Sequence, residues 1–368
     1  MKKILVITNI PSYHQVELFN EICKSKKISF KVYYLINKTV DRHWKKDFKI
    51  KHDHNFLKTT HLLKNKGVYY NKGILKNVKK ENPDIIVLTQ YANISQQILL
   101  YYYWLKRNRV SLKFWSEKPG ISFYEVPIVN SNFLRTIFRK ISLVPILNNR
   151  KIQIWGIGSK AVNYFTKRIK SEVVNFPYFL DTKRFDNSKK RDFNGKLKIL
   201  YAGKFNKRKG FDILLSFLEN TEKEFLNNFE FTLLGTGEYM NRVNELDKKR
   251  DNVTYKSFVE RQSMPEYYSK HDLFLFPGRY DGWGMVVNEA MASGLVIVAS
   301  KAIGAIEDVV LDRANGILIE ENVNSIKLKL SWVISNRESL HSISENAKKT
   351  SLKNDVKAGS KLFLKLLN

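Results

Sequence analysis

Residues 273–299 read LFLFPGRYDGWGMVVNEAMASGLVIVA. This stretch begins with an apolar run of strand length, Leu273–Phe276, and continues into a glycine-rich loop. An apolar helical pattern follows from about Gly284, and a second strand-like run occupies Leu295–Ala299. Strand, glycine loop, helix and strand in this order predict one βαβ unit of a buried parallel sheet.

Short apolar runs alternate with longer amphipathic runs on both sides of this unit, a pattern that predicts an α/β protein with parallel sheets. The strands expected in the first half are Lys3–Thr8, Ile28–Leu35, Asp84–Leu88, Ser111–Trp115, Ile152–Trp155 and Glu172–Asn175. The strands expected in the second half are Leu197–Ala202, Glu230–Leu234, Val253–Tyr255, Leu273–Phe276, Leu295–Ala299 and Gly316–Ile319. We therefore predict two doubly wound domains, with a ligand cleft between the carboxyl ends of their strands.

A polar break at residues 181–195 separates the two groups of strands and contains three consecutive basic residues, 189–191. We interpret this break as a linker between a first domain, residues 1–180, and a second domain, residues 196–351. The last segment, residues 352–368, has a helical pattern, and we expect it to cross back onto the first domain.

The composition is that of a folded protein with large cores, because 43% of the 368 residues are hydrophobic. The single cysteine, Cys23, excludes an internal disulfide framework and fits a reducing compartment. The apolar run at the N-terminus stops at Thr8 without a small-residue cleavage site, so we interpret it as a strand and not as a signal peptide. No stretch approaches the ~18 apolar residues of a membrane-spanning helix, and we expect a cytoplasmic location.

The formal net charge of +29 is unevenly distributed, since residues 1–180 hold 33 Lys and Arg against 10 Asp and Glu. Such an asymmetry indicates an anionic partner for the first half, and a generally lysine-rich composition explains it equally well. Residues 132–144 alternate apolar and basic side chains at helical spacing. A helix of this kind fits peripheral contact with the anionic inner face of a membrane, although an ordinary core-facing helix fits too. No nucleic-acid-binding motif is present, so we expect no nucleic-acid partner.

A basic loop that contains Lys204 and Lys209 follows the strand at Leu197–Ala202 and precedes an apolar helix. A strand, a glycine, cations and a helix N-terminus in succession suit a diphosphate, because backbone N–H groups and lysines both favour an anion. The alternative is a solvated loop in a lysine-rich chain. A second turn, Leu234–Glu238, contains two glycines but lacks the last glycine of a dinucleotide fingerprint.

Two carboxylates stand out in residues 273–299, with Asp281 in the glycine loop and Glu289 on the helix. Glu289 shares a helix face with Met285 and lies about 6 Å deeper than the helix mouth. Its sequence neighbours are apolar, so a largely buried carboxylate that needs a partner is expected. This spacing suits an elongated ligand, with helix-mouth amides at one end and a carboxylate that accepts ribose hydroxyls at the other.

Together these motifs resemble the donor domain of the retaining glycosyltransferase family 4. The resemblance rests on an ordered set from residue 203 to residue 318, namely Gly203-Lys204…Lys209-Gly210, Leu234–Gly237, Phe258-Val259…Tyr268…His271-Asp272, Asp281–Gly284…Glu289–Gly294 and Asn315–Leu318. It implies a GT-B fold, a UDP- or GDP-sugar donor and retention of anomeric configuration. It also implies that no metal or other cofactor is required, and the sequence contains no Asp-x-Asp pair of the kind that metal-using transferases employ.

The resemblance further implies roles for individual residues. Lys204 and Lys209 would bind the diphosphate and stabilise the leaving group, while Glu289 would bind the ribose hydroxyls. Asp281 stands at the first acid position, where the family has a Glu, and would face the transferred sugar. The other donor-binding residues implied are Gly203, Gly235, Thr236, Phe258, Val259, Gly282, Trp283, Gly284 and Met285.

The first domain offers two acceptor-side candidates, Glu117 and His14. Glu117 falls at the end of an expected strand, where a carboxylate can orient an acceptor hydroxyl, and a structural salt bridge is the alternative. We interpret His14 as a loop residue in a segment that lacks the glycine pair common in the family. We interpret the histidines of the triplet His52–His54 as polar residues at the surface and not as metal ligands.

We therefore predict a hexosyl- or N-acetylhexosaminyltransferase that acts on a glycan or lipid-linked glycan in cell-surface polysaccharide or lipopolysaccharide synthesis. The alternative is a non-catalytic sugar-nucleotide sensor or scaffold of the same fold, and the joint presence of Lys204, Lys209 and Glu289 argues against it. An NAD-dependent oxidoreductase is disfavoured because the glycine fingerprint is incomplete.

Overall fold

The computed structural model describes residues 1–37, 49–63, 68–89, 93–105, 110–118, 143–149, 151–186 and 191–367. The chain divides into two compact units. Unit 1 comprises Met1–Phe179 together with Val356–Asn368, and unit 2 comprises Leu180–Asp355. The last segment of the chain therefore belongs to the same unit as the first.

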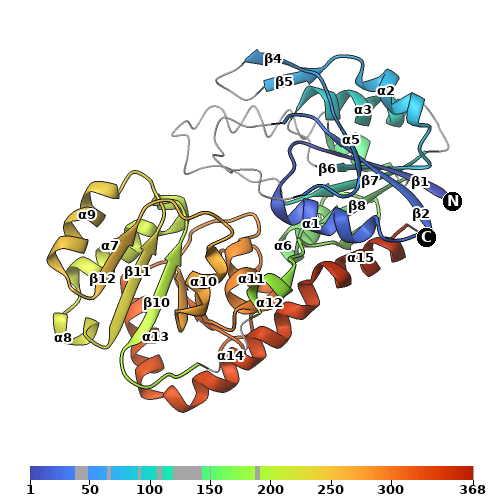
Figure 1. The fold of residues 1–368 in the computed structure, drawn as a ribbon. Coiled ribbons are helices and arrows are strands. Elements are labelled where there is room, and N and C mark those ends of the chain that lie inside the picture. The colour runs from blue at the N-terminus through green and yellow to red at the C-terminus, as the bar shows by residue number, and fades with distance from the viewer. Residues whose placement is uncertain are drawn as a thin grey trace. The chain divides into compact units, whose positions relative to one another are not determined.

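Unit 1 is built on a seven-stranded sheet with the strand order β3-β2-β1-β6-β7-β8-β9 (Figure 1). The strands are β1 (Lys2–Thr8), β2 (Ile28–Tyr34), β3 (Asp53–Phe56), β6 (Ile85–Thr89), β7 (Ser111–Ser116), β8 (Ile152–Gly156) and β9 (Val173–Asn175). Every neighbouring pair is parallel. A separate antiparallel pair consists of β4 (Thr59–Leu63) and β5 (Val68–Asn71).

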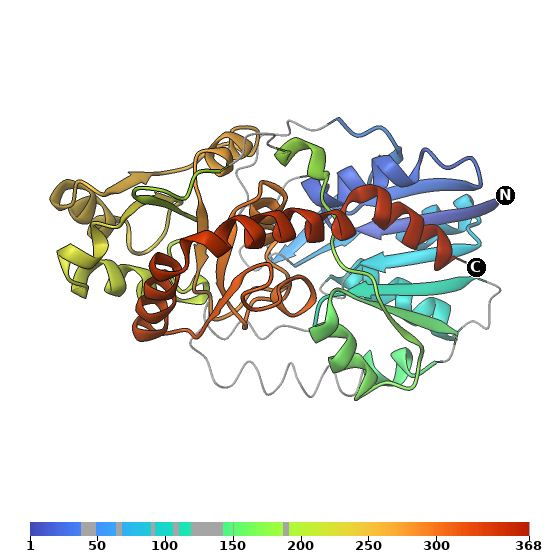
Figure 2. The same ribbon diagram turned by 90° about the horizontal axis from the view of Figure 1, so that it is seen from below.

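Helices cover both faces of this sheet, as expected of a doubly wound domain. One face packs against α2 (Ile74–Glu81), α3 (Ile94–Leu105), α5 (Val144–Leu147) and α6 (Ser159–Thr166) in a single apolar cluster. The other face carries α1 (Tyr13–Ile22) and α15 (Val356–Lys365), which lie side by side although they come from opposite ends of the chain (Figures 1 and 2). Phe363 of α15 packs its ring 5.4 Å from that of Trp155 and 5.8 Å from that of Phe30.

Unit 2 repeats this plan with a six-stranded parallel sheet in the order β12-β11-β10-β13-β14-β15. Its strands are β10 (Leu197–Ala202), β11 (Phe229–Leu234), β12 (Val253–Lys256), β13 (Leu273–Phe276), β14 (Val296–Ser300) and β15 (Ile317–Ile319). Its helices are α7 (Phe211–Asn220), α8 (Lys223–Leu226), α9 (Met240–Lys249), α10 (Met264–Ser269), α11 (Met285–Ala292), α12 (Ile306–Val309), α13 (Val323–Ser335) and α14 (Arg337–Ser351). The predicted fold class, two Rossmann-like doubly wound parallel sheets, is therefore confirmed.

Three strands of unit 1 have no counterpart in the prediction, namely β3, β4 and β5. The sequence of β3 is Asp-His-Asn-Phe, which lacks the apolar character of a buried strand. It forms the edge of the sheet, where only β2 pairs with it, so solvent tolerates its polar side chains. None of the helices that the structure describes is long and apolar enough to cross a membrane.

The described part of the predicted linker, residues 181–195, is packed into unit 2. It contains a short 3-10 helix, Thr182–Phe185, whose Phe185 is 2% exposed. The hydroxyl of Thr182 donates a hydrogen bond to Asp355 Oδ2 at 2.7 Å. Polar side chains of the segment that we interpreted as a linker therefore bond to the body of unit 2.

Candidate functional site

Strand order places the candidate site of unit 2 at the carboxyl ends of β10 and β13. The chain runs from β10 outward to β11 and β12, then returns to β13 and continues outward to β14 and β15 on the other side. The sheet therefore has its switch point between β10 and β13, where open α/β sheets bind ligands. The basic loop leaves β10 at this point and the glycine loop leaves β13, so segments about seventy residues apart in sequence meet there.

Direct contacts join these two loops. The backbone N–H groups of Arg279 and Tyr280 donate to the carbonyl oxygen of Arg208 at 3.0 and 3.2 Å. Gly210 has a φ of +67°, and a Cβ atom there would lie 1.9 Å from the carbonyl oxygen of Pro277. Only a glycine allows the first turn of α7 to approach the end of β13 this closely.

Hydrogen bonds from neighbouring side chains fix the conformation of the basic loop. Tyr201 is fully buried, and its hydroxyl donates to the carbonyl of Lys204 at 3.0 Å. Asn206 caps a one-turn 3-10 helix by accepting a hydrogen bond from the backbone N–H of Lys209 at 3.0 Å. On its other flank the loop meets the glycine turn of Gly235 and Thr236, because Phe205 N donates to the carbonyl of Thr236 at 2.9 Å.

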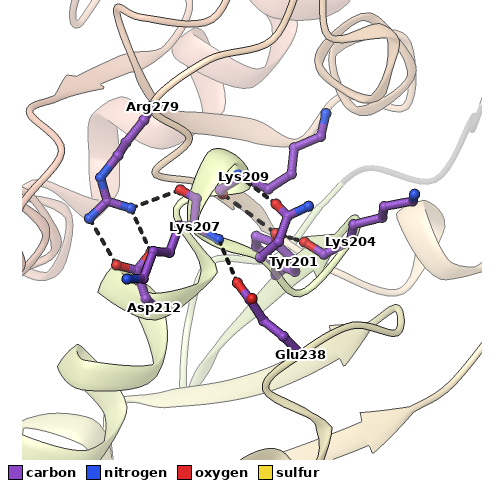
Figure 3. Close-up of polar contacts among 8 residues, drawn as sticks. Tyr201, Lys204, Lys207, Lys209, Asp212, Glu238 and Arg279 are labelled. Atoms are coloured by element: carbon purple, nitrogen blue, oxygen red, sulfur yellow. Dashed lines mark hydrogen bonds and ion pairs between the residues drawn. The ribbon is translucent and has the colours of Figure 1, made fainter. Parts of the chain in front are cut away.

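Some of the cations in this region serve the structure itself. Arg279 forms a two-pronged ion pair with Asp212, with N···O distances of 2.6 and 2.9 Å, and also donates to the carbonyl of Lys207 (Figure 3). Glu238 accepts from the backbone N–H of Lys207 at 3.2 Å. In Figure 3 the side chains of Lys204 and Lys209 extend away from the Arg279–Asp212 pair.

The structure brings two of the predicted site residues, Lys209 and Asp281, into direct contact. The ammonium group of Lys209 forms an ion pair with Asp281 Oδ2, and the two side chains are 14% and 18% exposed. The same ammonium lies 5.3 Å from the centre of the Phe276 ring, within the range of a cation–π interaction. Lys204 is exposed, and the Gly203 before it directly follows β10.

The glycine loop ends where α11 begins. Gly284 precedes the helix with a φ of +94°. The segment is fixed by its own carbonyls, because Asp281 O accepts from Gly304 N at 3.0 Å and Trp283 O accepts from Ala305 N at 2.7 Å. The side chain of Trp283 is buried and donates to Asn288 Oδ1 at 2.9 Å, so its indole belongs to the core of the unit.

Glu289 has the partners that its apolar sequence neighbours led us to expect. It is 8% exposed, and its Oε2 accepts a hydrogen bond from the hydroxyl of Tyr268 at 3.0 Å. Its Oε1 lies 3.7 Å from Arg261 Nε. Burial and the nearby carboxylate raise the pKa of Tyr268 well above its usual value, so this phenol stays a donor. Met285, at the mouth of the same helix, is half-buried.

Two of the predicted donor-binding residues, Phe258 and Val259, lie in the loop after β12, and Phe258 is 58% exposed. Both line a cavity of about 500 Å³. Its other lining residues come from β11, β12, the loop after β12, α10 and the turn after α10, namely Thr232, Thr254, Lys256, Glu260, Ser263, Glu266, Tyr267, Lys270 and His271. The loop of Phe258 and Val259 therefore borders an open space next to the helix of Tyr268.

Unit 1 has an equivalent switch point between β1 and β6, and it is occupied by neutral side chains. Thr89 donates to Thr8 Oγ1 at 2.9 Å, and Thr8 donates to Gln15 at 3.1 Å. Asn93 donates to Asn9 Oδ1 at 2.7 Å. Hydroxyls and amides that bond to one another in this way form a cross-linked polar layer at the ends of the strands.

The two acceptor-side candidates lie on different elements of unit 1. His14 is in the first turn of α1, with its ring 4.3 Å from that of Tyr178 and its Nε2 3.4 Å from Ser12 Oγ. Glu117 directly follows β7 and is half-buried. In the sheet, β6 lies between β1, which precedes His14, and β7, which precedes Glu117, so the two residues follow strands that are not neighbours.

The interpretation of His52 as a polar residue exposed at the surface is wrong. His52 is 3% exposed, its Nε2 lies 2.9 Å from the hydroxyl of Tyr34, and its Nδ1 lies 2.8 Å from Asn20 Oδ1. Burial lowers the pKa of His52 to about 3, so the ring is neutral at pH 7. Residues 132–142 of the predicted basic helix lie outside the described residues. Among the described residues no group of three or more His, Cys, Asp or Glu could hold a metal ion, and metal independence remains a prediction.

Sequence reasoning assigned no supporting role to three residues of this site, namely Tyr268, Arg261 and Arg191. Tyr268 and Arg261 contact the carboxylate of Glu289, and Arg191 donates hydrogen bonds to backbone carbonyls behind it. Their sequence distances from Glu289 range from 21 to 98 residues, so no local spacing signals the association. The apolar neighbours of Glu289 signalled that a partner must exist, without identifying it.

Comparison with known proteins relates part of the chain to glycosyltransferases by sequence. Residues 182–350 match the family model described as glycosyl transferases group 1, and this range lies within unit 2. An uncharacterized glycosyltransferase of Methanocaldococcus jannaschii is 31% identical over 158 residues, which cover 42% of this chain and 43% of that protein. The capsular polysaccharide biosynthesis glycosyltransferase CapM of Staphylococcus aureus is 24% identical over 216 residues, or 57% of this chain and 53% of that protein. The matches thus span about a third to a half of the curated relatives' lengths.

Solved structures resemble the chain over its full length. Sucrose-phosphate synthase of Thermosynechococcus elongatus is 14% identical with a TM-score of 0.73, covering 100% of this chain and 98% of that one. The HepE protein of Anabaena in complex with UDP is 15% identical with a TM-score of 0.73, covering 100% and 99%. At these identities the similarity is one of fold, and the predicted GT-B fold is confirmed.

Proposed function

We propose that this chain is a glycosyltransferase that moves a sugar from a UDP- or GDP-sugar to a hydroxyl of a glycan or lipid-linked glycan. The match of residues 182–350 to group 1 glycosyl transferases supports the reaction class. The capsular relative CapM, and a Klebsiella pneumoniae protein from a cps region that is 28% identical over 134 residues, support a role in cell-surface polysaccharide synthesis. HepE, which shares the fold, binds UDP and UDP-glucose.

The observation that carries the proposal is the meeting of Lys204, Lys209 and the α11 N-terminus at one switch point of unit 2. An ammonium group and helix-mouth N–H groups at the same strand ends provide positive charge for a diphosphate. Glu289, one turn further along α11, accepts a hydrogen bond from Tyr268 and lies 3.7 Å from Arg261, and ribose hydroxyls can donate to the same carboxylate. Asp281, already bound to Lys209, would then face the transferred sugar.

In the proposed reaction the bond between C1 of the sugar and the diphosphate oxygen breaks, and the acceptor oxygen bonds to C1 on the same face. The acceptor's hydroxyl proton leaves with the departing nucleoside diphosphate. Lys204, Lys209 and the N–H groups near Gly284 stabilise the negative charge that develops on the leaving group, a role worth about 3–4 kcal/mol per well-placed donor. Because these cations supply the charge, no metal is required.

Unit 1 would hold the acceptor. In this proposal Glu117 or His14 orients the hydroxyl that attacks, since both lie near strand ends on the side where α/β domains bind ligands. Reversible contact with an anionic inner-leaflet membrane would bring lipid-linked acceptors within reach, and the net charge of +29 favours such contact. The cytoplasmic location is part of the same proposal.

Thermal unfolding with a panel of UDP- and GDP-sugars tests the donor. A ligand at a hundred times its Kd stabilises the native protein by about 2.7 kcal/mol, so the correct donor should raise the Tm by several degrees. The same donor should then be hydrolysed slowly without acceptor. Binding with no hydrolysis or transfer would favour the non-catalytic sensor, and no Tm shift with any sugar nucleotide would refute the proposal.

A further inference from the structure

Arg191 occupies an unusual position for a residue in a basic segment. It stands behind α10 and α11, and burial lowers the pKa of its guanidinium to about 10. The group is therefore still positively charged at pH 7. A charged side chain that has lost much of its hydration must recover hydrogen bonds from the protein, and those bonds reveal what it holds.

All the hydrogen bonds of this guanidinium go to backbone carbonyls at the ends of two helices. At the end of α10, Nη2 donates to Tyr268 O at 3.1 Å and Nη1 donates to His271 O. At the end of α11, Nη2 donates to Ser293 O at 2.6 Å and Nε donates to Gly294 O at 2.8 Å. Carbonyls at helix C-termini lack intrahelical donors and carry partial negative charge, so an arginine satisfies both needs there.

One nitrogen atom, Nη2, connects the two residues that determine where the Glu289 carboxylate lies. Tyr268, whose carbonyl it binds, donates its hydroxyl to Glu289 Oε2 at 3.0 Å. Ser293, whose carbonyl it also binds, donates its backbone N–H to the carbonyl of Glu289 at 3.0 Å. The contacts close a ring that runs from Arg191 to Tyr268, to Glu289, to Ser293 and back to Arg191.

This ring links the ends of the two helices by hydrogen bonds, beside the 3-10 helix Thr182–Phe185, which also contacts both helices. α10 is only six residues long, and a helix of that length has little stability of its own. The position of the Tyr268 hydroxyl relative to Glu289 therefore depends on what holds the end of α10 against the end of α11. A rigid planar guanidinium can bond to both ends at once, whereas the single ammonium of a lysine cannot reproduce its directions.

We propose that Arg191 is a positioning residue for the donor site, which fixes α10 against α11 so that Tyr268 and Glu289 present a preformed acceptor for the ribose hydroxyls. The inference rests on the proposed function, because it assigns Arg191 to the ribose contact of that same site. Its effect is on affinity for the ribose, since preorganisation of a contact lowers the cost of forming it.

Titration calorimetry with UDP, GDP and their 2′-deoxy counterparts tests the proposal on the full chain. The wild-type protein should prefer one ribonucleotide to its deoxy form by about tenfold, the value of one hydrogen bond to a carboxylate. Arg191→Met should reduce this preference to about twofold, because the carboxylate is no longer held in place. Arg191→Lys keeps the charge but loses the fork, and its preference should fall between the two.

Arg337→Met is the matched control. Arg337 also donates to backbone carbonyls, those of Phe193 and Gly195, but it bonds to neither α10 nor α11. This variant should lower the Tm and leave the tenfold ribose preference unchanged, which separates positioning from general stability. If Arg191→Met does not fold, the preference of Arg191→Lys decides the question.

Two outcomes would overturn the inference in distinguishable ways. A wild-type protein that binds neither UDP nor GDP refutes the proposed function and the inference with it. A wild-type protein that prefers the ribonucleotide, with the same preference in Arg191→Lys and Arg191→Met, refutes the role of Arg191 alone.

Discussion

The switch points of the two units have the same topology and opposite chemistry. In unit 1 the ends of β1 and β6 carry hydroxyls and amides, among them Thr8, Thr89 and Asn93, which bond to one another. In unit 2 the ends of β10 and β13 carry an ion pair between Lys209 and Asp281 beside the exposed Lys204. Neutral donors and acceptors suit sugar hydroxyls, whereas cations beside a helix mouth suit a diphosphate.

The comparison shows that the same topology can place very different side chains at a switch point. Both sheets reverse their winding direction at a central pair of strands, and both therefore open a crevice there. The two crevices differ in how the polar groups at the strand ends find partners. In unit 1 the buried amides satisfy one another, while in unit 2 the ammonium of Lys209 is paired with the carboxylate of Asp281.

The largest effect should come from removing the central cation of unit 2. We expect Lys209→Ala to reduce kcat/KM for transfer by about 10²–10³, because the charge on the leaving diphosphate loses a donor. The substitution should leave the helices and sheets intact, and circular dichroism measures whether it does. Lys223→Ala, which removes an exposed cation of α8, is the control and should behave as wild type. Wild-type turnover in Lys209→Ala would remove this lysine from the mechanism.

The next effect should come from replacing one glycine of positive φ in each unit by alanine. Gly210 and Gly73 both have positive φ values, +67° and +78°, but only Gly210 faces a carbonyl, that of Pro277. Gly210→Ala should therefore lower the free energy of unfolding by ~3 kcal/mol, whereas Gly73→Ala should cost only about 1 kcal/mol. Urea denaturation measures both. Equal losses would mean that the close approach of the two unit 2 loops contributes nothing to stability.

The smallest effect should come from the neutral switch point. Asn93→Ala removes the donor to Asn9, Gln96 and the Tyr69 hydroxyl, and it should destabilise the protein by ~2 kcal/mol. Affinity for a nucleoside diphosphate should not change, because that ligand is assigned to unit 2. Asn77→Ala, on α2, is the control for stability. A weakened nucleotide affinity in Asn93→Ala would contradict the assignment of the nucleotide to unit 2.

Sequence reasoning identified most strands, since buried parallel strands are apolar runs of recognisable length. Leu273–Phe276, for example, occupies the predicted residues. It failed at β3, an edge strand whose pattern is polar, and at His52, whose partners Tyr34 and Asn20 come from other segments. A histidine in a polar triplet looks exposed unless the elements that bury it are known.

The candidate site could be predicted in part, because some of its residues stand in recognisable local motifs. Lys209, Asp281 and Glu289 stand in local motifs with a glycine loop or a helix start, and spacing along the chain indicates their chemistry. The support behind them has no such pattern. Tyr268 and Arg191 acquire their roles only because α10 and α11 end beside each other.

By itself the sequence determined the two doubly wound sheets and the positions of the charges along the chain, because strand patterning and glycine loops are local properties. The tertiary structure decided which charges meet, namely Lys209 with Asp281 and Arg191 with the helix ends that hold Glu289. Parallel strands bring residues from distant segments to one edge of a sheet. Side chains from such segments can form hydrogen bonds of about 3 Å only after the fold has brought them together. Such meetings depend on strand order, which no short stretch of the chain contains.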